Sequence, residues 1–330
     1  MSLENGSLNR TMAETENIHQ PVLLDEVVSL FGDIAPGTIV DATLGLGGHS
    51  QMLLTQYPTI DILGIDQDEE AIAIASQRLS AFGDRAKIVY GNFREIRRIV
   101  GEAGIDSVAG VLADLGVSSL QFDSPDRGFS FRFDSRLDMR MDAGSGSETV
   151  AEILASRSEE EIANIIYNFG EERASRRIAR RIVQKRDRGE PIKTTKQLAD
   201  TVASVIKKGP RDKVHPATKT FQALRIAANR EIEILEQFII DSAGLLQPRA
   251  ILAVITFHSL EDRIVKHTFQ KLSGKCYCPP RIPQCVCGAV KTVEIITKRP
   301  ITPDDDELKA NPRSRSAKLR AVRKIGEGAN

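Results

Sequence analysis

The sequence predicts an α/β fold in which one doubly wound sheet is interrupted by an all-helical insertion. Strands alternate with helices over roughly the first 114 residues, a rhythm typical of βαβ units and a parallel sheet. Several helical patterns then follow without a strand, until a new strand begins at Ala250. The length of 330 residues is sufficient for one large α/β domain that carries an insertion.

The first half of the chain contains the alternating elements. A short helical pattern comes first, from Val22 to Phe31. A buried strand is predicted at 38–41 and further strands at 60–65, 86–90 and 108–113, with helices at 49–55 and 69–79 between the first three.

The alternation ends at Gly116, and a loop-like stretch rich in Gly, Ser, Asp and Arg follows at 123–146. Helices are then predicted at 148–156, 159–168, 171–187 and 194–207, before one long helix at 218–242 and a strand at 250–255. We therefore expect a flexible polar tail at 1–18, a discontinuous α/β domain built from 19–140 and 215–330, and a helical insertion at 141–214.

Composition excludes a secreted or membrane-spanning protein. The N-terminal residues include no apolar signal sequence, and the longest apolar runs, such as 251–255, are far shorter than the ~20 residues of a membrane span. All four cysteines lie between Cys276 and Cys287, unlike scattered disulfides, so we expect a reducing cytoplasm. Lys plus Arg and Asp plus Glu both total 45, and the net charge therefore indicates no partner.

A glycine-rich turn follows the first predicted strand. Asp41 ends that strand, and the sequence Gly45-Leu46-Gly47-Gly48 leads into a helix, so the backbone can turn sharply and approach a ligand. Asp66 ends the next strand, where a carboxylate can accept both hydroxyls of an adenosine ribose. The pattern favours a nucleotide cofactor; the alternative is a tight turn without a ligand.

The spacing of these glycines does not match the dinucleotide pattern G-x-G-x-x-G, which disfavours NAD. S-adenosylmethionine, a sulfonium with an amino-acid tail, requires acidic partners instead of a pyrophosphate cradle, and Asp41 could supply one. Phe93, which follows the third strand, could pack against the adenine or simply belong to the core. Asp114 ends the fourth strand, where the reacting end of the cofactor is expected.

Several long motifs in a fixed order make the chain similar to one family. It resembles the bacterial 16S ribosomal RNA (cytosine-N4)-methyltransferases, known as RsmH or MraW, over roughly 19–320. The matching segments are His19-Gln20-Pro21-Val22-Leu23-Leu24, 41–50, 114–121, Arg127-Gly128-Phe129-Ser130-Phe131, 137–142, His215-Pro216-Ala217-Thr218, 221–225, 257–263 and Asn311-Pro312-Arg313-Ser314-Arg315-Ser316.

The resemblance implies a Rossmann-like class I methyltransferase with an inserted helical domain that takes the RNA substrate. The implied reaction is methylation of the exocyclic N4 of a cytidine in the decoding region of 16S rRNA, within the small ribosomal subunit. A homodimer is compatible with the sequence, which does not fix the oligomeric state. The implied cofactor contacts are Gly47, Gly48, His49, Asp66, Phe93, Asp114 and Gln121.

Transfer to cytosine N4 requires an acceptor for an amino proton, because the lone pair of that nitrogen is delocalised into the ring. Asp114 is the best-placed acceptor, although it could equally bind cofactor without a proton role. Asp138, Asp142 and His258 are alternatives, and for His258 we favour a structural hydrogen bond. Two alternative functions remain: a methyltransferase that acts on another substrate, and, in a different class, a ribosome assembly factor that binds S-adenosylmethionine without turnover.

Basic residues cluster in two runs that could neutralise phosphates. The first is predicted on one helix face opposite Ile178 and Ile182, although such a face can simply be solvated. Phe129, Phe131 and Phe133 alternate with arginines and suit stacking of a splayed base, but we expect at least two to pack in the core. The first run is Arg173, Arg176, Arg177, Arg180 and Arg181; the second is Lys309, Arg313, Arg315, Lys318, Arg320, Arg323 and Lys324.

The four cysteines form the pattern Cys276-x-Cys278 and Cys285-x-Cys287, in a segment (275–288) that is a departure from the family pattern. Two pairs of thiolates on short loops could hold a structural zinc, and the alternative is reduced or oxidation-sensitive thiols without metal. The implied reaction needs no metal, so no catalytic metal is expected.

Overall fold

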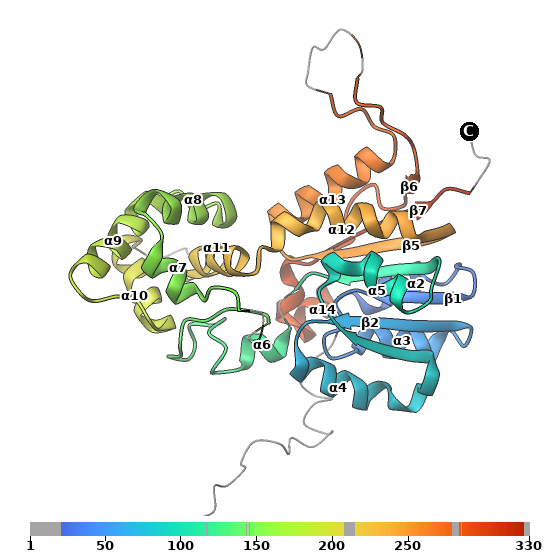
Figure 1. The fold of residues 1–330 in the computed structure, drawn as a ribbon, viewed down its shortest axis with the longest axis horizontal. Coiled ribbons are helices and arrows are strands. Elements are labelled where there is room, and N and C mark those ends of the chain that lie inside the picture. Colours follow the sequence, from blue (N-terminus) through green and yellow to red (C-terminus); the bar gives the residue numbers. More distant parts are fainter. Residues whose placement is uncertain are drawn as a thin grey trace, which may run out of the picture. The chain divides into compact units, whose positions relative to one another are not determined.

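A computed structural model describes residues 21–116, 118–142, 144, 146–207, 215–278, 284 and 286–326. The expected tail at 1–18 and Cys285 lie outside these residues. The chain forms two compact units. The first consists of Met1–Ser119 with Ile239–Asn330 and contains the sheet, whereas the second, Leu120–Phe238, is helical (Figure 1).

The sheet of the first unit has the strand order β3-β2-β1-β4-β5-β7-β6. Strands β1 to β5 are parallel, as the alternation of elements predicts, and β7 is antiparallel to both of its neighbours. The strands are β1 (Gly37–Asp41), β2 (Ile60–Asp66), β3 (Ala86–Tyr90), β4 (Val108–Asp114), β5 (Leu246–Thr256), β6 (Val293–Ile295) and β7 (Lys318–Lys324).

Helices cover this sheet because their apolar stripes pack on its nearly continuous apolar strands. Phe31, Leu53 and Leu79 share one buried cluster with Ile39 and Ile62 of the sheet. The helices of this unit are α2 (Leu24–Leu30), α3 (Gly48–Gln56), α4 (Glu69–Leu79), α5 (Ile96–Glu102), α13 (Ser259–Leu272) and α14 (Asp305–Ala310), with 3-10 turns at Ser80–Arg85, Phe93–Glu95 and Pro312–Ser316. The helix α12 (Glu231–Leu245) begins in the second unit and ends in the first.

The antiparallel pair of β6 and β7 was not predicted from the sequence. β6 has only three residues, and β7 lies within the second basic run. Burial nevertheless explains β7, since Leu319, Ala321 and Val322 are buried between its two neighbours. Three basic residues of that run are also paired with carboxylates outside it: Lys309 with Asp306, and Lys318 and Arg320 with Asp262. Part of the positive charge of the second basic run is therefore already compensated, and its role in binding phosphates stays a prediction.

The second unit is a bundle of short helices, as predicted between the fourth and fifth strands. α8 packs against α9 and α11, and α10 packs against α9. α8 and α11 approach each other closely at Gly170, which has no Cβ. A Cβ at this position would lie 2.6 Å from the Lys219 carbonyl oxygen. The helices are α6 (Ser119–Asp123), α7 (Val150–Ser156), α8 (Glu159–Gly170), α9 (Ser175–Asp187), α10 (Thr195–Val205) and α11 (Thr218–Asn229).

The predicted single helix at 218–242 is two helices, because α11 ends at Asn229 and α12 begins at Glu231. Arg230 between them has a left-handed backbone, with φ of 53°. Asn229 uses its side chain elsewhere: its amide donates to the Met139 carbonyl, and its oxygen accepts from the Met141 N–H, both at 2.8 Å. Asn229 thereby ties the loop at 139–141 to the end of α11.

The helical unit is larger than the expected insertion. It also includes residues 120–140 and 215–238, and with them the whole of α11, which were expected in the α/β domain. The reason is packing, because α11 buries its apolar side chains, among them Phe221 and Leu224, against α7 and α8. Every helix in the described part of the chain is too short or too polar to span a bilayer.

Candidate cofactor and active site

The glycine-rich loop crosses the carboxyl ends of three strands. The Ala42 N–H donates to the Leu112 carbonyl of β4 at 2.8 Å, and the Leu44 N–H donates to the Ile65 carbonyl of β2 at 2.9 Å. Gly45 and Gly47 have φ angles of 51° and 76°, a region that favours glycine. The loop is therefore fixed to the edge of the sheet where ligands of doubly wound folds bind.

The first described residues lie against this loop. A Cβ on Gly48 would clash with the Pro21 ring, so glycine is required there by packing. The His49 Nε2 lies 2.9 Å from the Val22 carbonyl oxygen, and since a carbonyl only accepts, this nitrogen carries the proton. Gly48 and His49, both expected to contact cofactor, thus also join the N-terminal segment to the site.

Asp66 is placed at the end of β2 by two backbone hydrogen bonds. Its Oδ2 accepts from the Gly45 N–H at 2.7 Å, and its Oδ1 accepts from the Asp68 N–H at 2.9 Å. Each carboxylate oxygen has two lone-pair sites, so each can accept a further hydrogen bond. Burial raises the pKa of Asp66 to about 6, although the backbone donors partly offset this effect.

Asp41 lies beneath the loop and is only 2% exposed. Its Oδ2 accepts from the Ser50 hydroxyl at 2.6 Å, and its Oδ1 accepts from the Thr43 N–H at 3.4 Å. Burial raises its pKa, while the Ser50 hydrogen bond and the nearby His49 lower it. Asp41 therefore places a buried carboxyl group beside the glycine-rich loop. Ser50 was not predicted as a partner of Asp41, although its position in the first turn of α3 is a usable signal.

Phe93 follows β3 in a turn that is tied to the end of β2. The Gly91 N–H donates to the Asp66 carbonyl at 2.8 Å, and the Asn92 amide donates to the Gln67 side-chain oxygen at 2.6 Å. The Phe93 ring is partly buried. The turn thus brings Phe93 to the same edge of the sheet as Asp66. The adenine of the cofactor is expected at this edge.

Asp114 ends β4 and pairs in register with Ile255 of β5. Its N–H donates to the Thr43 hydroxyl at 2.6 Å, and its Oδ1 accepts from the Gly116 N–H at 3.3 Å. Burial raises its pKa to about 6; the nearby His49 lowers it, and the charges of Asp41 and Glu261 raise it further. Asp41, Asp66 and Asp114 thus form an acidic edge, by which we mean these three carboxylates at the carboxyl ends of β1, β2 and β4.

The alternative proton acceptors have other roles. Burial raises the pKa of Asp138, but its two hydrogen bonds with Arg140, at 2.7 and 2.9 Å, bring it below the ordinary value. Asp142 accepts from the Gly144 N–H at 2.8 Å. His258 caps α13, since its Nδ1 accepts from the Glu261 N–H at 3.3 Å, which is the structural hydrogen bond favoured from the sequence.

Other expected site residues belong to the helical unit. Gln121 is buried in α6, and its cofactor contact stays a prediction. Phe129 is buried, and Phe131 packs against His215 and Phe221, with ring centroids 4.6 and 5.1 Å apart. Phe133 is 43% exposed. Two of the three phenylalanines therefore pack internally, as expected.

An acidic edge beside a glycine loop at the carboxyl ends of parallel strands suits a cationic, adenosine-bearing cofactor. The fold and this site define a Rossmann-like methyltransferase of class I that uses S-adenosylmethionine. A family model described as the MraW methylase family matches residues 16–325. The chain belongs to that family.

Relatives with curated names cover nearly the whole chain. One from Geobacter sp. (strain M21) is 47% identical over 309 residues, which are 93% of this chain and 98% of the relative. One from Carboxydothermus hydrogenoformans is 44% identical over 307 residues, with the same coverage of 93% and 98%. One from Symbiobacterium thermophilum is 46% identical over 312 residues, covering 94% and 98%. Each of these relatives is named ribosomal RNA small subunit methyltransferase H.

Proposed function

We propose that this protein methylates the exocyclic N4 of a cytidine in the decoding region of 16S rRNA, within the small ribosomal subunit and in the cytoplasm. The observation that carries the proposal is the acidic edge of a chain whose relatives are named for small-subunit ribosomal RNA. A partly exposed carboxylate at the end of β4, Asp114, provides the acceptor that an amino group requires.

The residues of the first unit fit S-adenosylmethionine. Asp66 retains acceptor sites for the ribose hydroxyls, and Phe93 would pack on the adenine at the next turn. The ionised carboxylates favour a ligand that carries positive charge. Gly47, Gly48 and His49 would form the floor of the site. When bound, the cofactor supplies an electrophilic methyl group on its sulfonium.

Asp114 would accept a hydrogen bond from the N4 amino group and take the proton that this nitrogen must lose. The raised pKa of about 6 makes Asp114 a stronger base than an ordinary aspartate while leaving it mostly ionised at neutral pH. Its backbone is held by Thr43 and its side chain by Gly116, so the carboxylate is positioned before substrate arrives.

The helical unit would bind the RNA. On α9, Ser175, Ile178, Ala179 and Ile182 are buried, while Arg176, Arg177 and Arg180 are exposed, as the sequence pattern predicts. Arg180 lies 3.4 Å from Glu159, so part of the positive charge is already compensated. Phe133 adds an exposed ring on which a base could stack.

Small ribosomal subunits that lack the modification should test the proposed substrate. With radiolabelled S-adenosylmethionine, we expect about one methyl group per subunit, located on the N4 of one cytidine of the decoding region when the nucleotide is mapped by mass spectrometry. Subunits that already carry the methyl group are the control and should accept none. Transfer to another nucleotide, or to protein, would refute the proposal.

Removing the exposed positive charge near α9 should weaken RNA binding without affecting cofactor. We expect a variant with Arg173, Arg176 and Arg177 changed to Gln to show a KM for subunits at least tenfold higher, and a shallower salt dependence, because each lost phosphate contact lowers the slope by about one. A matched variant changes Lys193, Lys196 and Lys207, which are exposed elsewhere on the same unit. Equal KM values for the two variants would show that the α9 arginines are merely solvated.

A further inference from the structure

The segment between α13 and β6 brings together cysteines from two stretches of chain. Its stem is closed by a hydrogen bond from the Thr292 N–H to the Leu272 carbonyl, at 2.8 Å, and by an antiparallel bridge between Ser273 and Lys291. We call residues 273–292 the cysteine loop. Its described residues are 273–278, 284 and 286–292.

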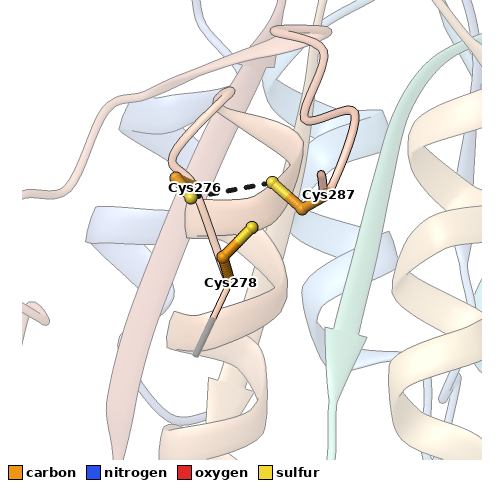
Figure 2. A group of neighbouring side chains, drawn as sticks. All are labelled: Cys276, Cys278 and Cys287. Atoms are coloured by element: carbon orange, nitrogen blue, oxygen red, sulfur yellow. Dashed lines mark hydrogen bonds between the residues drawn. The ribbon is translucent and has the colours of Figure 1, made fainter. Parts of the chain in front are cut away.

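The sulfur atoms of the cysteine loop have the spacing of metal ligands. Cys276, Cys278 and Cys287 point toward one another, with all three Sγ atoms within 4.8 Å (Figure 2). The Sγ atoms of Cys276 and Cys287 are 3.7 Å apart, whereas the two sulfurs of a disulfide are about 2.05 Å apart. Two sulfurs bound at ~2.3 Å to one tetrahedral zinc lie about 3.8 Å apart. The observed distance therefore matches two corners of a zinc tetrahedron.

Backbone geometry and charge also suit bound thiolates. The Val286 N–H donates to the Cys278 Sγ at 3.4 Å, an interaction that supports a negatively charged sulfur. Lys271 lies over the Tyr277 ring, with its Nζ 5.5 Å from the ring centroid. The loop also carries Lys275 and Lys291. Three thiolates and one divalent ion together carry a net negative charge, and these cations stabilise that charge.

The described side chains of the cysteine loop have little apolar packing. Tyr277 is 51% exposed, Val286 75% and Val290 68%, so these side chains bury little surface. Fixing the backbone costs about 1–2 kcal/mol per residue. Segments without a core are usually held by a metal or a covalent cross-link. A metal at the three sulfurs would supply the missing free energy.

We propose that Cys276, Cys278 and Cys287 bind one structural Zn²⁺ that holds the two arms of the cysteine loop together. Thiolate ligands select zinc over the harder divalent cations, and another donor would complete the tetrahedron. Cys285 lies outside the described residues, and the proposal rests on the other three.

The zinc site lies at the opposite edge of the sheet from the acidic edge. α13 starts just after the carboxyl end of β5 and has 14 residues, so it carries the chain about 20 Å back along the sheet. β6 starts at that same distant edge, because Val293 pairs with Lys324 at the end of β7. Zinc would therefore stabilise the loop and not take part in methyl transfer.

Elemental analysis tests the metal directly. Full-length protein purified with reductant and without chelator should contain about one zinc per chain, and replacement by Co²⁺ should give the intense visible absorption of a tetrahedral cobalt thiolate. Cys276→Ser and Cys287→Ser should lose most of the metal, whereas Val290→Ala, in the same loop, should keep it. Metal-free wild-type protein, or full zinc content in both serine variants, would overturn the proposal.

A second measurement separates a structural site from other roles. Removing zinc with a chelator should increase proteolytic cleavage within 273–292 at least tenfold, while the affinity for S-adenosylmethionine stays within about twofold. Loss of cofactor affinity together with zinc would overturn the structural role. A disulfide between Cys276 and Cys287 in metal-free, fully active protein would instead identify a redox pair. If the protein contains zinc but does not methylate small subunits, the proposed function is wrong and the zinc site still stands.

Discussion

Asp114→Asn should abolish most methyl transfer while the protein stays folded. The amide can still accept a hydrogen bond at its oxygen, but it cannot take the proton that cytosine N4 must lose. General-base catalysis contributes about 10²- to 10⁴-fold, so we expect the single-turnover rate on small subunits to fall by that factor. The affinity for S-adenosylmethionine, measured by calorimetry, should change far less. A collapse of that affinity would make Asp114 a binding residue, and an unchanged rate would show that it is not the base.

The stability of the same variant provides an independent check. Because burial raises the pKa of Asp114 to about 6, the ionised form costs the folded state stability at neutral pH. The contribution of this group is most favourable below its ordinary pKa of 3.8 and is lost as the pH rises through about 6. Asp114→Asn should therefore melt at the wild-type temperature or a few degrees higher at pH 7.5. Asp61→Asn, an exposed change on β2, should alter neither activity nor stability.

Asp66→Ala should weaken the binding of S-adenosylmethionine by about 30- to 100-fold. Hydrogen bonds to a charged acceptor contribute about 1.5–3 kcal/mol, and the substitution removes the acceptor for the ribose. It also frees the Gly45 N–H, which donates to Asp66 at 2.7 Å, so the glycine loop itself loses an anchor. Asp66→Asn retains one acceptor oxygen and should show a smaller loss. Unchanged affinity in the alanine variant would exclude Asp66 from the ribose site.

The wild-type affinity should also depend on pH in a defined direction. Asp66 and Asp114 both have pKa values raised to about 6 by burial. Protonation below that pH removes the negative charge that favours a cationic ligand, so affinity should fall as the pH is lowered through 6. The Asp66→Asn variant should lose part of this dependence. Calorimetric titrations between about pH 5 and pH 8 would measure it.

The central fold was predictable because most of its strands are nearly continuous apolar runs. β1 to β5 appear where the pattern places them; β1, β2, β4 and β5 are largely buried, which explains their apolar runs, whereas β3 is only partly buried. The break at Arg230 carries no such signal: neither Gly nor Pro marks it, and the apolar pattern continues through it. Asn229, which stands beside the break, bonds with Met139 and Met141, and these lie about 90 residues away in sequence.

The acidic edge was predictable for a topological reason. The carboxyl ends of parallel strands meet at one edge, so carboxylates that end β1, β2 and β4 converge there. Contacts between distant segments were not predictable, such as Pro21 against Gly48 or Val22 with His49. The partial neutralisation of the second basic run was not predictable for a related reason, because its partners Asp262 and Asp306 lie outside the run. The spacing of residues along the sequence predicts which of them share a helix or strand, but it predicts little about which helices and strands contact one another.

The position of the helical unit between β4 and β5 has a consequence for synthesis of the chain. Asp114 pairs with Ile255, so the two strands at the centre of the sheet are separated by the entire helical unit. The helical contacts are local and form early, whereas β5 must close a very long loop to reach β4. β7, which lies between β5 and β6, leaves the ribosome later still. The nascent chain therefore exposes the unpaired edge of β4 until β5 emerges, and the unpaired edge of β5 until β7 emerges.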